Sequence, residues 1–181
     1  MSTTAEQTTS IPTGTWGLDP IHSSVGFAVA YGGSGTFRGG FKEFDAKLVD
    51  GKLEGVAKVG SVDLDEPNLV GHLQTPDFFD AEQFPELQFS SKTIERNGDE
   101  VTIDGEITLR GVTKPVTITG TVFGPTTDIG MNGEIQRIAF DLETKVNRRD
   151  FGIDWNRELP GGAEALANTV KITANLALVQ A

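Results

Sequence analysis

The chain has 181 residues and a formal net charge of −11 at pH 7. This length fits one domain that buries its own core, and an acidic chain lacks the basic surface of a nucleic-acid binder. The sequence contains no cysteine, which excludes a disulfide framework, a thiolate zinc site and a cysteine nucleophile.

The first 14 residues are polar and rich in threonine, with neither a basic start nor an apolar run. This composition predicts a flexible leader at 1–14 and no signal peptide, followed by one domain at 15–181. The chain has no stretch of 18 apolar residues, so no stable membrane insertion is expected. The sequence therefore predicts a cytoplasmic protein and leaves export by another route open.

Large apolar residues recur at every second position through most of the domain, which is typical of half-buried β-strands. Turn signals such as Asp50-Gly51 separate these runs. The eight predicted strands are 24–31, 41–49, 53–64, 87–96, 101–110, 116–122, 138–146 and 170–178. The predicted helical segments are short, at 68–74 and 163–166, with a single turn near 78–81.

Eight strands with one apolar face each favour an all-β fold with antiparallel neighbours, because several connections are short enough for hairpins. Two architectures fit: a sandwich of two sheets, or an up-and-down barrel that closes on itself. Gly105 and Gly120 stand on the apolar faces of their strands. Since glycine leaves room there, the pattern leans towards a curved sheet or a cavity.

The segment 31–40 contains five glycines and superficially resembles a phosphate-binding loop. Such a loop needs a helix after it, whereas the residues that follow alternate as a strand, so a hairpin or bulge is predicted. Asp150-Phe151-Gly152 matches a kinase triplet, but the chain has no other kinase motif and is too short for a kinase.

Histidine offers few catalytic or metal-ligating positions in this chain. His22 lies beside two serines and near Asp19, but local sequence does not assemble a hydrolytic triad. His22 and His72 do not have the spacing of a zinc site. We therefore expect no catalytic residue, no metal and no cofactor. The apolar strand faces remain, and they line either a packed core or a cavity for a lipophilic ligand.

Several blocks in fixed order resemble the YceI-like family of lipid-binding proteins. The first block is Trp16–Ser23, followed by alternating apolar residues and by Phe37–Phe41. The most specific segment is Pro76–Asp80 with Phe84-Pro85, and two further blocks are Gly105–Val116 and Asn147–Ile153. Together they cover about 15–179, nearly the whole chain.

The resemblance implies an extended, lipocalin-like antiparallel β-barrel of eight strands with short helices in its connections. It implies an elongated apolar pore that holds a polyisoprenoid or another long amphiphilic lipid, for storage or transport and without catalysis. Some members of the family are homodimers, so a homodimer is a possible assembly. Tyr31 stands where the family usually has a histidine, and its phenol keeps a hydroxyl group without imidazole chemistry.

The predicted lipid-binding residues are those whose side chains share the apolar strand faces, together with Tyr31. They are Phe27, Val29, Tyr31, Phe89, Ile107, Leu109, Phe140 and Leu142. Because the net charge of −11 opposes an anion, the sequence favours a neutral head group such as that of an isoprenoid quinone.

Three alternatives remain open at this point. The first is an enzyme on a barrel scaffold that acts on a lipid with His22 or Tyr31 as acid or base. The second is a stress-related interaction domain with a fully packed interior and no ligand. The third is a metal bound at His22 or His72.

Overall fold

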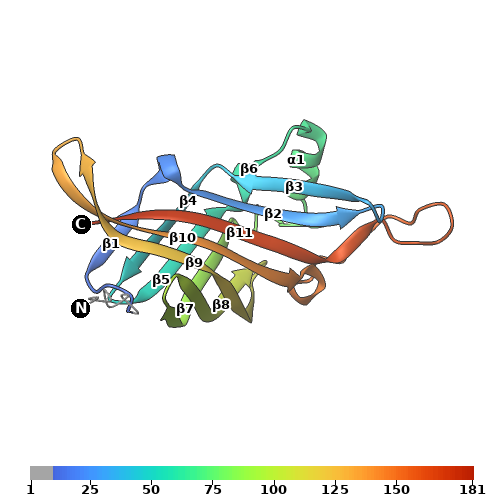
Figure 1. Ribbon diagram of the computed structural model, residues 1–181. Coiled ribbons are helices and arrows are strands. Elements are labelled where there is room, and N and C mark those ends of the chain that lie inside the picture. The colour runs from blue at the N-terminus through green and yellow to red at the C-terminus, as the bar shows by residue number, and fades with distance from the viewer. Residues whose placement is uncertain (1–9) are drawn as a thin grey trace.

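The computed structural model describes residues 10–181, and most of the predicted leader at 1–14 lies outside them. Eight strands form a closed ring in which every neighbouring pair is antiparallel, with β1 pairing with β11 to close it. Figure 1 shows the long strands of this barrel. In ring order they are β1 (Thr15–Leu18), β4 (Phe44–Val49), β5 (Lys52–Lys58), β7 (Glu86–Asn97), β8 (Glu100–Leu109), β9 (Val112–Gly130), β10 (Gly133–Asn147) and β11 (Leu166–Gln180).

Three further strands extend the sheet beyond the ring at one end. They are β2 (Ser24–Tyr31), β3 (Gly35–Phe41) and β6 (Val62–Asp63), and β2 pairs with the part of β11 that β1 leaves free. Each continues a ring strand after a short break. The breaks are the 3-10 turns η1 (Pro20–His22) and η2 (Val59–Ser61), and the pair Lys42-Glu43. The predicted eight-stranded barrel is therefore confirmed, and the sandwich is wrong.

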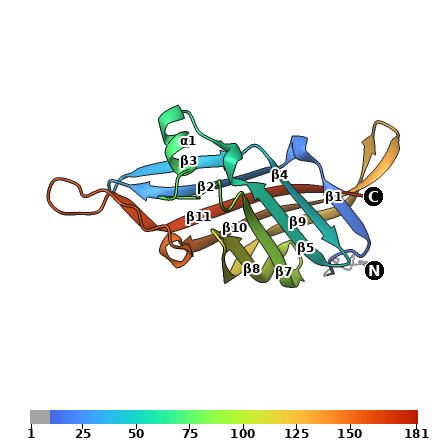
Figure 2. The ribbon, with the colours of Figure 1, turned by 180° about the vertical axis from the view of Figure 1, so that it is seen from behind.

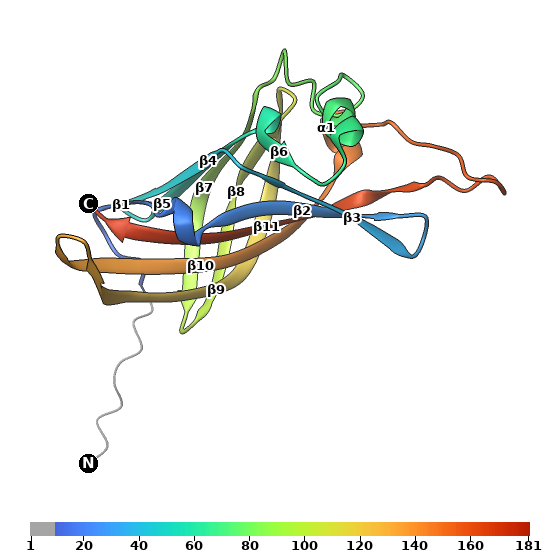
Figure 3. The same ribbon diagram turned by 90° about the horizontal axis from the view of Figure 1, so that it is seen from above.

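The two ends of the barrel differ in what surrounds them. At one end the β9–β10 hairpin projects beside the C-terminus (Figures 1 and 3). At the other end lie the β2–β3 hairpin, the segment 152–165 and α1 (Pro67–Leu73) (Figure 3). Figure 2 shows from behind how β4, β5, β7 and β8 form the wall opposite β10 and β11.

The predicted helix at 68–74 is confirmed as α1, which Glu66 caps by accepting a hydrogen bond from the backbone N–H of Asn68. The predicted helix at 163–166 is wrong, because this segment is extended and Leu166 begins β11. The backbone of Ala165 donates to Arg157 and accepts from Gly32. Four residues are too few to nucleate a helix against such pairing. The segment 78–81 forms hydrogen-bonded turns and not a helical turn.

The hairpin that joins β2 to β3 explains the glycine-rich segment. Gly32 and Gly33 take φ values of 63° and 79°, a left-handed conformation that glycine adopts without the strain of a Cβ atom. The chain then returns directly as β3, with Tyr31 opposite Gly35. The hairpin interpretation is confirmed, and no helix follows that could receive a phosphate.

Two apolar clusters form the core, one toward each end. The first contains Trp16, Leu48, Ile103, Ile138 and Leu178 and fills the β1 end of the ring. The second lies under α1 and next to the 3-10 turn η3 (Arg148–Phe151). Its members include Phe41, Val59, Leu109, Phe151 and Ile153.

Asp19 links the break between β1 and β2 to β10 through hydrogen bonds. Its carboxylate is expected to account for part of the pH dependence of the stability. Its Oδ2 accepts from Nδ1 of His22 and from Nη1 of Arg137, both at 2.7 Å. These two hydrogen bonds lower the pKa of Asp19 from 3.8 to about 2. A depressed carboxylate pKa stabilises the fold above the unfolded value, and this contribution disappears as pH falls through the folded value.

We therefore expect Asp19 to contribute about 2 kcal/mol at neutral pH that is lost between about pH 4 and pH 2. The measurement is the free energy of unfolding against pH for the natural chain and for Asp19→Asn. The other carboxylates are shared by both proteins, so the difference between the two curves isolates Asp19. Parallel curves over this range would contradict the assignment.

Candidate functional site

A cavity of about 500 Å³ opens at the end of the barrel that carries α1; we call it the outer cavity. Its walls come from β2, β3 and β11 on the barrel side. On the other side α1, the segment 78–79, η3 and the segment 153–157 cover it. The aromatic residues in its wall are Phe27, Tyr31, Phe37, Phe41, Phe78, Phe79, Phe151 and Trp155.

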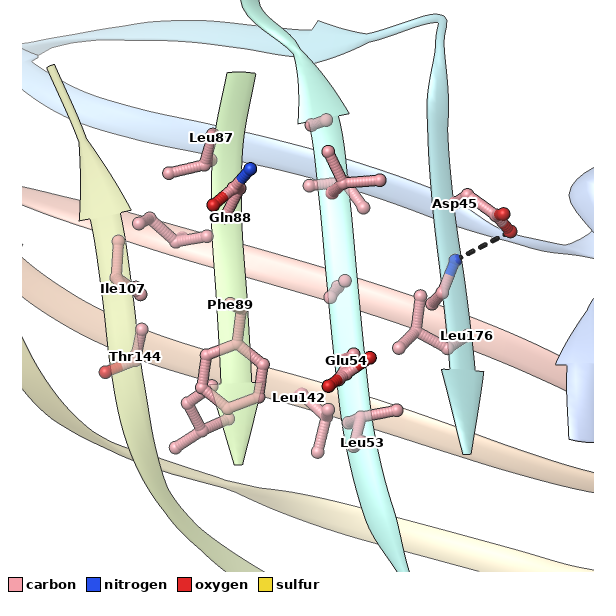
Figure 4. Close-up of a pocket in the computed structure, with 18 of the residues that line it drawn as sticks. Asp45, Leu53, Glu54, Leu87, Gln88, Phe89, Ile107, Leu142, Thr144 and Leu176 are labelled. Atoms are coloured by element: carbon pink, nitrogen blue, oxygen red, sulfur yellow. Dashed lines mark hydrogen bonds between the residues drawn. The ribbon is translucent and has the colours of Figure 1, made fainter. Parts of the chain in front are cut away.

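A second, smaller cavity of about 100 Å³ lies inside the closed ring; we call it the inner cavity. Figure 4 shows Phe89 and Ile107, from β7 and β8, beside Leu142 and Leu176 of β10 and β11. Leu53 of β5 also lines it (Figure 4). The side chains that face this space are almost entirely apolar.

The two cavities adjoin, because Leu87 and Ile172 line both of them. Along β11, Leu166 lines the outer cavity and Leu176 the inner one. Ten residues of an antiparallel strand span about 30 Å. The two cavities together therefore follow about this length of β11.

Two glycines on the strand faces determine the positions of two phenylalanine rings in the cavity walls. A Cβ atom on Gly39 would lie 2.6 Å from Cζ of Phe27, and one on Gly105 would lie 2.8 Å from Cε2 of Phe89. Each ring thus rests directly on a glycine of the neighbouring strand. With any other residue there, the ring would have to move, so these glycines keep the rings flat against the barrel wall.

The predicted lipid-binding residues divide between the two cavities. Phe27, Val29, Tyr31 and Leu109 line the outer cavity, whereas Phe89, Ile107 and Leu142 line the inner one. Phe140 lines neither and packs in the core cluster at the β1 end. Their role in binding a lipid stays a prediction.

Sequence reasoning missed the covering segments of the outer cavity. His72 of α1 makes edge contacts with the rings of Phe78 and Trp155, at centroid distances of 4.9 and 5.0 Å. Its Nε2 also lies 2.9 Å from Oδ2 of Asp77. The available signal was the block at 76–80, which served to identify the family but gave no spatial position.

Arg148 holds the segment 152–167 in place beside the outer cavity. Its side chain is 4% exposed, and its guanidinium donates to four backbone carbonyl oxygens. They belong to Ile153, Trp155, Leu166 and Ala167, at 2.7, 2.8, 3.3 and 2.9 Å respectively. Burial lowers the pKa of Arg148 from its usual value, but an arginine remains protonated at neutral pH.

The two histidines lie in different places, and His72 lines the outer cavity. His22 is exposed and pairs with Asp19 next to the barrel, and it lines neither cavity. Within residues 10–181, no three metal-ligating side chains gather into one group. The fully packed interior predicted by the interaction-domain alternative also differs from the structure, which contains the two cavities.

The model of the YceI-like domain matches residues 16–178 of the chain. The chain belongs to the YceI-like family. Protein YceI of Escherichia coli O157:H7 is 34% identical over 139 residues, which are 73% of this chain and 71% of that protein. A UPF0312 protein of Photorhabdus laumondii is 29% identical over 137 residues, or 72% and 70% of the two chains. The family resemblance predicted from the sequence blocks is confirmed.

Solved structures share this barrel. BcnA of Burkholderia cenocepacia matches with a TM-score of 0.74 at 21% identity, over 88% of this chain and 98% of its own. A polyisoprenoid binding domain of Saccharophagus degradans matches with a TM-score of 0.72 at 13% identity, over 92% and 98%. A YceI protein of Campylobacter jejuni gives 0.56 at 26% identity, over 72% and 83%. Identities of 13% and 21% establish the fold and not the ligand.

None of the helices in residues 10–181 has both the length and the apolar character needed to cross a bilayer.

Proposed function

We propose that this member of the YceI-like family binds a long-chain amphiphilic lipid, of the polyisoprenoid type or similar, with its tail in the two cavities. The observation that carries the proposal is the pair of adjoining apolar cavities, which together follow about 30 Å of β11. An apolar space with a few polar groups at its mouth is what such a ligand requires. The structural neighbour from Saccharophagus degradans, described as polyisoprenoid binding, agrees with this ligand class.

Because the burial of apolar surface drives binding, the affinity is expected to depend little on the exact chemistry of the tail. Each buried methylene group contributes about 0.8 kcal/mol, so a long tail binds tightly without any strong polar contact. One methylene more or less therefore changes the affinity by only about fourfold. We therefore propose a carrier or storage role for a class of lipids, with no chemical step on the ligand.

The test is organic extraction of the full chain, purified without detergent, followed by mass spectrometry of the extract. We expect a lipid with one long tail at close to one molecule per barrel. An extract without lipid is followed by addition of long-chain lipids to the same protein, read by displacement of a fluorescent fatty acid. Failure of both measurements would overturn the proposed function.

A further inference from the structure

The charged side chains that line the outer cavity are basic, whereas the chain as a whole is acidic. Acidic residues outnumber basic ones by 26 to 15 in the sequence. The wall of the outer cavity nevertheless contains two arginines, Arg148 and Arg157, together with His72 and Tyr31, and no aspartate or glutamate. The local charge of this wall is positive in an acidic protein.

The charge of Arg148 is not neutralised by an ion pair within residues 10–181, because all four of its hydrogen bonds go to backbone carbonyls. A guanidinium has five N–H donors, so one N–H of Nη2 remains uncommitted. The nearby carboxylates of Asp154 and Glu164 face solvent, and Glu164 is paired with Arg149. A buried cation without an ion-pair partner favours an anion in the adjoining space.

Tyr31 and Arg157 both line the outer cavity, on either side of the segment 163–166. The backbone N–H of Ala165 donates to the carbonyl of Arg157, and the N–H of Gly32 donates to the carbonyl of Ala165. In this ladder Ala165 stands between the end of β2 and the segment that carries Arg157, and the side chains of Tyr31 and Arg157 both reach the cavity. In residues 10–181, neither the Tyr31 hydroxyl nor the Arg157 guanidinium has a side-chain hydrogen bond or an ion pair, so both are available to a ligand.

We propose that the lipid carries an anionic head group, a carboxylate or a phosphate, held by the Arg157 guanidinium and the Tyr31 hydroxyl with the charge of Arg148 behind them. This inference rests on the proposed function and adds the charge of the head group to it. Guanidinium groups match both anions with paired N–H donors. The uncharged phenol contributes a single O–H donor.

The net charge of the chain by itself favours a neutral head group. It does not decide the charge of the head group that binds. Charges more than about 8 Å apart are largely screened at physiological ionic strength. A head group at the mouth of the cavity therefore responds mainly to the groups that line it. Asp77 lies next to His72 of this wall, and the two arginines that line the cavity outnumber this carboxylate.

The test compares three ligands that share one saturated tail: stearic acid, stearyl phosphate and stearyl alcohol. Dissociation constants at neutral pH are measured on the full chain by displacement of a fluorescent probe. A hydrogen bond to a charged group changes an affinity by about tenfold or more. We expect at least one anion to bind about tenfold more tightly than the alcohol, and the ratio of acid to phosphate identifies which anion the site prefers.

Matched variants locate the effect. Arg157→Gln is expected to bring the affinity for the anion close to that for the alcohol while leaving the alcohol unchanged. Tyr31→Phe is expected to reduce the preference for the anion by a few-fold. Arg38→Gln changes the net charge equally, but Arg38 is exposed on β3 and does not line the cavity, so the preference should persist.

Each outcome distinguishes this inference from the proposed function. Equal binding of acid, phosphate and alcohol would overturn the anionic head group and leave lipid binding standing. A preference lost equally in Arg38→Gln and Arg157→Gln would also overturn it, because the effect would then reflect net charge alone. No binding of any of the three ligands, or of longer homologues, would overturn the proposed function and this inference with it.

Discussion

Replacing Arg148 with methionine is expected to lower the free energy of unfolding by about 3–5 kcal/mol. Methionine keeps much of the aliphatic volume but removes the four hydrogen bonds that Arg148 donates to carbonyl oxygens of the segment 153–167. Only the Leu166 oxygen keeps another side-chain donor, Nδ2 of Asn156. A buried acceptor that loses its partner costs about 1–3 kcal/mol. Some of these carbonyls regain water when the segment loosens, so the expected loss is smaller than the sum over all four.

Arg149→Gln is the matched control, since Arg149 is the next residue along η3. Its side chain contacts Asn168 and Glu164 near the surface, and partly exposed pairs contribute at most about 1 kcal/mol. Denaturant unfolding followed by circular dichroism gives both values, and limited proteolysis within 152–165 should accelerate for Arg148→Met alone. A loss for Arg148→Met no larger than that for Arg149→Gln would refute this role of Arg148.

The regular part of the barrel could be predicted because strand periodicity is a local signal. Val101, Ile103 and Ile107 share a face in the sequence pattern, and the structure buries all three. Glycine turns such as Asp50-Gly51, both with positive φ, mark the hairpins equally well. These features follow from pleat geometry and turn chemistry, which depend on neighbouring residues only.

Features that depend on distant partners could not be predicted in this way. The breaks at η1 and η2 convert single long strands into pairs, and β1 was not predicted as a strand at all. Its four residues are held between β4 and β11, whose positions no local pattern gives. The segment 163–166 reads as a helix by composition and becomes extended because Arg157 and Gly32 pair with it.

The candidate site likewise has one part that the sequence predicted and one part that it did not. Alternation placed Phe27 and Val29 on the face that lines the outer cavity, and Phe89 and Leu142 on the face that lines the inner one. The segments that cover the outer cavity, with Trp155 and Arg148, return over the barrel from far along the chain. Their side chains belong to no periodic pattern, so the motif at 147–153 predicted a family but not a position beside the cavity.

Ala174→Leu is expected to shorten the tail that the barrel accepts without harming the fold. Ala174 lies on β11 and lines the inner cavity, so the larger side chain fills space that the end of a long tail would occupy. A saturated tail advances about 1.2 Å per bond, so palmitic acid reaches about 18 Å and lignoceric acid about 28 Å. Only the longer acid extends past Ile172 into the inner cavity when its head group lies near Tyr31.

The affinity for lignoceric acid should therefore fall about a hundredfold, because excluding about four methylene groups costs roughly 3 kcal/mol. Palmitic acid, which ends in the outer cavity, should bind as before. Thermal stability should be unchanged or slightly higher, since filling a cavity commonly stabilises a fold. Displacement of a fluorescent fatty acid and a melting curve measure these quantities.

The same substitution on the outside of the barrel, Ala139→Leu, controls for added bulk. Ala139 lies between Ile138 and Phe140 on β10, and alternation turns it away from their buried face. It should leave the affinities for both acids unchanged. If Ala174→Leu left the affinity for lignoceric acid unchanged, the tail would not enter the inner cavity, because a tail held wholly in the outer cavity does not sense β11 beyond Ile172. An equal loss for both acids would also contradict the prediction, because the effect would then not depend on tail length.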